Sequence, residues 1–113
     1  MSTSCNSISN QAFSATEAEL TSERNLASLA KAISHPARIR ILKILLTLDN
    51  NNGCLNSDLV SELGLAQSTV SEHLKILKLS NLITAEPIPP RVCYRINRDT
   101  INRFSTTFIE IFQ

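Results

Sequence analysis

The sequence has no apolar run near the roughly 18 residues that a membrane span needs. Its start, MSTSCNSISNQAFSATEAEL, lacks the basic segment and apolar block of a secretory signal. Aromatic residues make up only 4% of the 113 residues, so an aliphatic core is expected. The cytoplasm is the expected compartment and no membrane partner is predicted. The length fits one domain with a single modest core.

The sequence also lacks a set of residues that could form a catalytic site. The two histidines, His35 and His73, have no paired nucleophile, and the two glycines form no phosphate-binding loop. The sequence therefore predicts that the protein is not an enzyme. His35 has no cysteine or acidic residue beside it, so it is interpreted as a helix-start residue rather than a ligand.

The cysteines are Cys5, Cys54 and Cys93, an odd number with no Cys-x-x-Cys pair. In a reducing cytosol such cysteines are expected to be free thiols rather than a disulfide framework. Their role stays open here, because free cysteines serve as buried packing, as redox sensors or as soft metal ligands.

The net charge is only +1, but it is unevenly distributed. Residues 67–98 hold five basic and two acidic residues, a net of +3. Residues 1–34 hold two basic and three acidic residues, a net of −1. A local basic patch in a nearly neutral chain fits a polyanionic partner that is met on one face.

The N-terminal part is predicted to be a tail followed by a helix. Residues 1–13 are rich in Ser and Asn and are interpreted as a mobile tail, with one domain over 14–113. Ser14-x-x-Glu17 has the form of a capping box, and an apolar stripe follows it at helical spacing. A helix is therefore expected over 15–33.

A second helix is expected over 36–48. Pro36 suits its first position, and Ile39, Leu42 and Leu46 are predicted to form its buried stripe. The segment DNNNG ends this helix, because Asn and Gly tolerate left-handed turn geometry.

The next segment has the pattern of a helix-turn-helix. A very short strand at residues 54–55 is expected first, and Asn56 or Ser57 can cap a short helix that stops at Gly64. Another helix begins about three residues later, near Gln67. Two short helices joined by a tight glycine-containing turn form this motif. The second helix buries a narrow apolar stripe and shows polar groups on its opposite side: Ser68, Ser71, Glu72 and Lys75.

After Asn81 the residues alternate in character on each side of a Pro-rich segment, which predicts a hairpin with residues 86–90 as its loop. Asn97 or Asp99 then caps a last helix that carries a continuous apolar seam. The predicted order is helix, helix, short strand, helix, helix, hairpin, helix. This is a mainly α fold with a small β-hairpin, a winged helix-turn-helix. The polar side of the helix near Gln67 is interpreted as a surface for the DNA major groove.

Three segments, SHPARIRIL, LGLAQSTVSEHLKILKLSNLI and VCYRI, resemble the ArsR/SmtB family of bacterial winged-helix repressors over roughly residues 20–112. The resemblance implies double-stranded operator DNA as a partner, with binding relieved by a metal, a metalloid or another chemical signal. It also implies a homodimer paired through the first and last helices. The expected interface residues are Leu26, Leu29, Ile101, Phe104, Phe108 and Ile111.

The resemblance also implies which residues contact DNA. The matching positions are Gln67, Ser68, Thr69, Ser71 and His73. Glu72 departs from the Arg, Gln or Lys often found there, and can either accept from a cytosine amino group or repel phosphate. Lys75, Lys78 and Arg91 are expected to add backbone contacts. His73 has a second interpretation, in which it packs beneath the hairpin.

The family's effector sites match less well. The arsenic-type pattern has two cysteines separated by one residue before an Asp-Leu pair, whereas CLNSDL has a single cysteine. The zinc-type pattern uses histidines on the last helix, and RDTINRFSTTFIEIF has none.

The winged-helix arrangement places the short strand beside the returning wing strand, so Cys54 and Cys93 are expected to lie close together. Cys5 is an optional third donor. Sulfur donors suit As(III), Sb(III) or a soft metal ion as the effector, while no cofactor is expected to be needed for folding.

Two alternatives to a repressor that is released by a thiophilic ion remain. One is an ArsR-type regulator without a metal site, which senses thiol oxidation or nothing. The other is a protein-interaction module built on the winged helix, which sequence-specific DNA retention would separate from a repressor.

Overall fold

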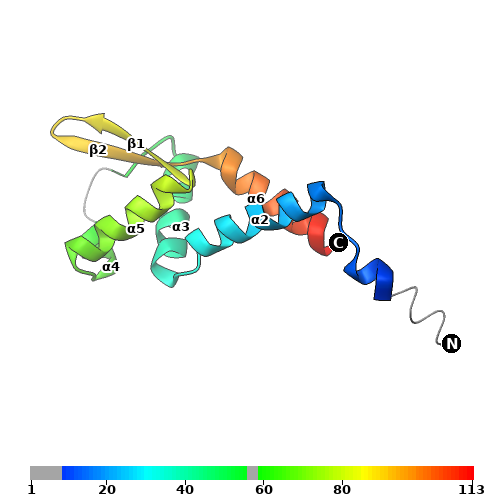
Figure 1. Ribbon diagram of the computed structural model, residues 1–113. Coiled ribbons are helices and arrows are strands. Elements are labelled where there is room, and N and C mark those ends of the chain that lie inside the picture. Colours follow the sequence, from blue (N-terminus) through cyan, green and yellow to red (C-terminus); the bar gives the residue numbers. More distant parts are fainter. Residues whose placement is uncertain (1–8, 56–58) are drawn as a thin grey trace.

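The computed structural model describes residues 9–55 and 59–113. A short helical turn at residues 9–13 falls within the predicted tail, and residues 1–8 lie outside the described part. The elements are α2 (Glu17–Ala32), α3 (Pro36–Asn50), α4 (Leu59–Leu63), α5 (Gln67–Leu79), β1 (Ile83–Ile88), β2 (Arg91–Ile96) and α6 (Arg98–Phe112). The hairpin and α5 lie at one end of the molecule, and α2 and α6 pack side by side at the other (Figure 1). The predicted winged helix-turn-helix order is confirmed.

The start of α2 differs from the prediction by two residues. The capping box is formed by Thr16 and Glu19, not by Ser14 and Glu17. The Thr16 hydroxyl accepts from the Glu19 amide at 3.1 Å, and the Glu19 carboxylate accepts from the Thr16 amide at 3.0 Å. The sequence holds two overlapping motifs of this form, and local pattern alone does not rank them.

Helix α3 begins as predicted, and its predicted buried stripe is confirmed at Leu42 and Leu46 but not at Ile39. Pro36 is in its first turn and the Nδ1 atom of His35 accepts from the Ala37 amide at 3.0 Å, so the interpretation of His35 as a helix-start residue is confirmed. The buried side chains are Ile41, Leu42 and Leu45. The prediction for Ile39 is wrong, because its side chain is 55% exposed.

Helices α3 and α5 are each followed by an asparagine in the left-handed backbone region. Asn52 has φ 57°, and the amide of Gly53 donates to the Leu48 carbonyl at 2.8 Å. Asn81 has φ 59°, and the amide of Leu82 donates to the Leu77 carbonyl at 3.0 Å. Both ends have the Schellman pattern of hydrogen bonds, which satisfies carbonyls left free by the helix.

The helix-turn-helix consists of α4 and α5. Gly64, at φ +64°, makes the turn between them as predicted, because a residue without a Cβ adopts this conformation at little cost. The predicted caps of α4, Asn56 and Ser57, lie outside the described residues. The predicted short strand is a single antiparallel bridge between Leu55 and Tyr94.

The hairpin is longer than predicted. Strands β1 and β2 pair antiparallel from Ile83–Ile96 out to Ile88–Arg91, so residues 86–88 belong to β1 rather than to a loop. The turn is Pro89 and Pro90. Proline is tolerated in β1 because each strand of a two-stranded sheet has an open edge that needs no amide donor.

The core lies between α3, α5 and the base of the hairpin. Its largest fully buried side chains include Ile41, Leu45, Leu77, Leu82 and Ile83, so the prediction of an aliphatic core is confirmed. Asn97 caps α6, one of the two caps that were predicted, and an ion pair between Arg98 and Asp49 joins α6 to the end of α3. In the described segments, no helix has both the length and the apolar character to cross a bilayer.

Candidate nucleic-acid interface and cysteine pair

Helix α5 has a buried face and an exposed polar face. Val70 and Leu77 pack into the core, which fixes the rotation of the helix about its axis. The opposite face is exposed and carries most of the predicted DNA contacts: Gln67, Ser68, Thr69, Ser71, Glu72, Lys75 and Lys78. The fold therefore brings these side chains together on one accessible surface.

A groove of about 320 Å³ separates this face from the hairpin. The α5 side carries Ser71, Lys75 and Lys78, and the hairpin side carries Ala85, Pro87, Val92 and Tyr94. Arg91 is exposed where β2 leaves the turn, at the far end of the hairpin (Figure 1). The hairpin side of this groove was not predicted. Its signal was the alternation of residues 92–94 beside the Pro-rich turn, which indicated a strand but not its neighbour.

The first turn of α5 begins after Ala66, its N-cap. Within the part of the chain that the structure describes, no side chain caps this turn. The first amides of a helix have no carbonyl partner within it, and the helix dipole favours an anion at that end. Ser68 and Thr69 lie in this turn, so a phosphate can be bound there by backbone and hydroxyl groups together.

His73 does not belong to the exposed surface. Its side chain is 6% exposed, and it points to the start of α3 rather than under the hairpin. Its Nδ1 atom lies 3.1 Å from Nη1 of Arg38, and its ring centroid lies 4.4 Å from that of His35. Burial chiefly, and then electrostatic interaction with His35 and Arg38, lower the pKa of His73 below 6.5, while Glu72 opposes them. The structure places His73 against the start of α3, apart from the exposed face that carries the other predicted DNA contacts.

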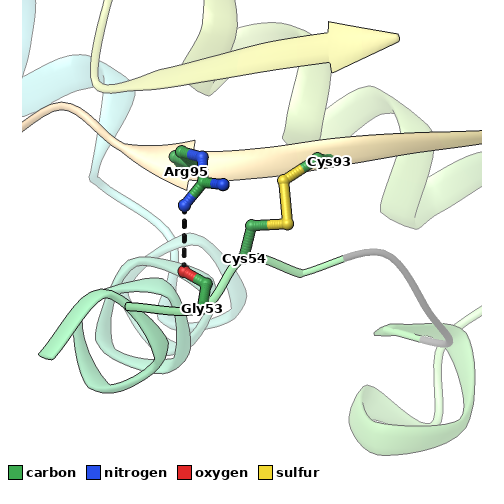
Figure 2. Close-up of a disulfide and its surroundings, with 4 residues drawn as sticks. All are labelled: Gly53, Cys54, Cys93 and Arg95. Carbon is green, nitrogen blue, oxygen red and sulfur yellow. Dashed lines mark hydrogen bonds between the residues drawn. A yellow bond between two sulfur atoms is a disulfide. The ribbon is translucent and has the colours of Figure 1, made fainter. Parts of the chain in front are cut away.

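Cys54 and Cys93 form a disulfide across 39 residues of sequence (Figure 2). The predicted proximity of these two cysteines is confirmed, and the prediction that they are free thiols is wrong. The antiparallel bridge of Leu55 and Tyr94 aligns the two segments and brings the Cα atoms of the cysteines to 5.7 Å. Cys93 is only 1% exposed, and Cys5 lies outside the described residues.

Arg95 strengthens the same connection. Its Nη1 atom donates to the Gly53 carbonyl at 3.3 Å, beside the disulfide in Figure 2. The wing strand is thus joined to the segment that enters α4 by a covalent bond, by a backbone bridge and by a side-chain hydrogen bond. Tyr94, which takes part in the bridge, also lines the groove beside α5.

The cysteine pair fits a thiophilic ion only after reduction, because sulfur binds such ions as thiolate. The Cα separation of 5.7 Å lets two thiolates reach one ion. Over the described ranges, no group of three or more His, Cys, Asp or Glu side chains is placed to hold a metal. The described residues therefore offer two sulfur donors at most.

The last helix exposes a row of aromatic side chains. The ring centroids of Phe104 and Phe108 are 6.4 Å apart and those of Phe108 and Phe112 are 4.9 Å apart. Phe108 is 48% exposed and Phe112 is 68% exposed, and Ile109 is exposed beside them. The predicted interface omitted Ile109 and Phe112. Phe112 follows Phe108 at the same spacing of four residues, so the sequence pattern could have included it, whereas Ile109 lies one position to the side of that row.

The other predicted interface residues lie closer to the protomer's own core. Leu29 and Ile101 pack against that core, and Leu26 is buried. Phe104 and Ile111 are partly buried. Thr100, Arg103 and Thr107 of α6 line a pocket with Leu26 and Leu29 of α2, which shows that these two helices cover each other within one chain.

Comparisons with known proteins agree with this geometry. A family model described as "Bacterial regulatory protein, arsR family" matches residues 35–85. The HTH-type transcriptional regulator YgaV of Escherichia coli (strain K12) is 31% identical over 91 residues, which are 80% of this chain and 89% of that protein.

Two solved structures share the fold. The homodimeric winged helix-turn-helix DNA-binding domain of Mb0332 from Mycobacterium bovis has a TM-score of 0.61 at 21% identity, covering 85% of this chain and 86% of that one. The cadmium metal-sensor CMTR from Mycobacterium tuberculosis has a TM-score of 0.51 at 33% identity, covering 68% and 76%.

The matched residues span α3, the helix-turn-helix and the start of the hairpin, and so include the exposed face of α5. The extended match to YgaV adds most of the remaining chain. The chain belongs to the ArsR family of bacterial transcriptional regulators and is not an enzyme.

Proposed function

We propose that this regulator is a homodimeric repressor that binds operator DNA in the cytoplasm through α5 and the hairpin, and that it is released by chemistry at Cys54 and Cys93. The observation that carries the proposal is the exposed polar face of α5, fixed by its buried stripe and bordered by a basic groove.

The dimensions and charges of this surface fit duplex DNA. The major groove is about 12 Å wide and admits one helix, so α5 can enter it by its N-terminal turn. Short hydroxyl and amide side chains in that turn suit base edges and phosphates. Lys75 and Lys78 flank the groove and Arg91 lies beside the hairpin turn, where each can meet a phosphate.

The DNA proposal predicts two different responses to substitution. Changing both Ser68 and Ser71 to Ala weakens binding to the specific site by about 1 kcal/mol for each hydrogen bond lost, and changes non-specific binding little. Changing Lys75 or Arg91 to Ala weakens all duplexes alike and lowers the salt dependence by about one counterion per phosphate contact. Fluorescence anisotropy at several salt concentrations, on a duplex selected from a random library, measures both.

Arg24→Ala is the matched control for the loss of one positive charge, because Arg24 is exposed on α2, away from the helix-turn-helix. It should leave affinity and salt dependence unchanged. A folded Ser68/Ser71 double variant with wild-type affinity would remove α5 from the proposed role, and failure to select any duplex would contradict the repressor itself.

The dimer proposal rests on the aromatic row of α6. Monomeric proteins seldom expose several large apolar side chains in one row, and such patches mark contact surfaces. A symmetric dimer lets the same patch cover its own copy. The Mb0332 domain, which shares the fold, is homodimeric. We assign the contact to Phe108, Ile109 and Phe112, with Phe104 and Ile111 at its border.

Phe108→Asp should therefore produce monomers, because it places a charge in the centre of the contact and leaves the protomer core intact. Sedimentation velocity at micromolar concentration measures the change. The control is Ile88→Asp, which adds a charge at a comparably exposed apolar residue of the hairpin and should stay dimeric. A monomeric wild type, or a dimeric Phe108→Asp variant, contradicts the assignment.

The disulfide favours oxidation as the signal at the cysteine pair. Two thiols lose two electrons and two protons when the S–S bond forms, and a hydroperoxide that accepts them breaks its O–O bond and leaves as water and an alcohol, or as two waters. The new bond fixes β2 to the segment before α4. The hairpin then loses freedom to adjust to the DNA backbone beside α5.

Binding of a thiophilic ion is the second candidate. Its support is the short separation of the two cysteines and the likeness to a cadmium sensor. An ion such as As(III) that bridges two thiolates would impose a similar link between the hairpin and α4. Either signal acts only by favouring the non-binding conformation, and a hundredfold release needs about 2.7 kcal/mol of such preference.

We expect reduced wild-type protein to bind the selected duplex at least about tenfold more tightly than the oxidised form, which is about 1.4 kcal/mol. Anisotropy is measured on reduced protein before and after adding peroxide or, separately, arsenite. Cys54→Ser and Cys93→Ser should bind DNA and lose the response, while Cys5→Ser, the matched control, keeps it. A double Cys54/Cys93 variant that still releases DNA places the site elsewhere, and a wild type that answers neither reagent ends the sensing proposal.

A further inference from the structure

Arg38, in the first turn of α3, contacts two other helices at once. Its Nε atom donates to the carbonyl oxygen of Ala32 at the end of α2, at 2.5 Å. Its Nη1 atom lies 3.1 Å from Nδ1 of His73 in α5. One part-buried guanidinium therefore joins the helix that packs with α6 to the helix proposed to read DNA.

The geometry fixes the protonation state of His73. An arginine side chain offers only donors and stays charged, so Nδ1 of His73 must be the acceptor. The imidazole is then neutral, with its proton on Nε2. Protonation of Nδ1 would set a donor against a donor, and one positive charge against another, at 3.1 Å.

The surroundings of His73 offer little to stabilise a charged ring. Its Nε2 atom is buried and has no hydrogen-bond partner among residues 9–55 and 59–113. The titratable and charged groups that act on it are His35 and Arg38, from the cap and first turn of α3, and Glu72 from α5 itself. Helices α3 and α4 and strand β1 pack against α5, and of these only α3 contributes such a charge.

We propose that Arg38 and His73 are a positioning pair that holds α5 in its DNA-binding orientation only while His73 is neutral, so that acid weakens operator binding. Neither side chain needs to touch DNA for this effect. The inference rests on the proposed function, since it names a second control over the same recognition helix, and it is independent of the cysteine pair.

The sign of the pH dependence follows from the direction of the shift. Because the pKa of His73 is lowered in the folded protein, the stabilisation of the neutral arrangement is fully present above pH 6.5. This stabilisation is lost as the pH falls from 6.5 toward the lowered pKa of His73 in the folded protein. Added positive charge near DNA ordinarily strengthens binding at low pH. A fall in affinity with acid is therefore opposite to the general electrostatic trend.

The test compares three proteins on the selected duplex between pH 7.5 and pH 5.0 at constant ionic strength. Wild type should hold its affinity above pH 6.5 and lose roughly threefold or more below it, with at most two protons linked per dimer. His73→Asn keeps an acceptor near the place of Nδ1 and cannot be protonated, so it should bind as wild type at pH 7.5 and not weaken in acid. His35→Asn is the matched control, because it removes the neighbouring imidazole and keeps a helix-capping side chain. It should still weaken in acid, with the loss beginning at a somewhat higher pH than in wild type, because one of the groups that lower the pKa of His73 is removed.

The Arg38→Met variant provides a second, independent test of the Arg38–His73 pair. It should lower affinity at every pH, because both hydrogen bonds are lost, and it should not show the additional loss in acid. The proposal is overturned if wild type binds as tightly or more tightly in acid, if His73→Asn retains the acid loss, or if His35→Asn abolishes it.

A measurement without DNA separates this proposal from the repressor proposal. In NMR titrations of free protein, the amide signals of α5 should shift below pH 6.5 in wild type and in His35→Asn, and should stay constant in His73→Asn. If no duplex is ever selected, the proposed function fails while these shifts still decide whether His73 positions α5.

Discussion

The burial of one face of α5 is the constraint on which the rest of this structure depends. Val70 and Leu77 enter the aliphatic core beside Ile41 and Leu45 of α3, so the helix cannot rotate without exposing them. Its polar face is thereby fixed outward, next to the hairpin groove. Because the core is closed by α3 and the base of the hairpin, a change in either element reaches the proposed DNA-binding surface through packed contacts.

Two sets of connections reach α5 and the hairpin from residues near the two ends of α3. Near its start, Arg38 joins the end of α2 to His73. Near its end, the disulfide, the Leu55–Tyr94 bridge and Arg95 join the hairpin to the segment before α4. We propose that the first responds to a proton and the second to two electrons. The proposed controls would act on one helix from two chemically distinct sites within a single domain.

Periodicity and capping motifs were sufficient to predict the order of elements, the helix-turn-helix with its Gly64 turn, and the exposed face of α5. They failed where two local choices have similar energies, as with the two overlapping capping boxes before α2. They also failed where tertiary packing decides, as with Ile39, whose side chain meets the stripe's spacing and still faces outward. The alternation of residues on each side of the Pro-rich stretch predicts a loop over residues 86–90, yet β1 is an edge strand and accepts Pro87.

The site was predictable to the same extent. The exposed side chains of α5 follow from the helix's own pattern. The contact of His73 with Arg38 joins residues 35 apart in sequence and leaves no local signal. The cysteines were placed together by the resemblance to a fold, but their oxidation state depends on chemistry that no spacing encodes. Compartment and an odd count favoured free thiols. The antiparallel bridge between Leu55 and Tyr94, which brings the two cysteines together, is a tertiary feature.

The most direct test of the central claim, that α5 is held with its polar face toward DNA, is an NMR footprint of labelled protein on the selected duplex. The account predicts that signals of residues 67–71, Lys75 and Arg91 shift on adding the duplex, while those of Phe108 and Phe112 do not. Shifts confined to α2 and α6, with α5 unchanged, would contradict it.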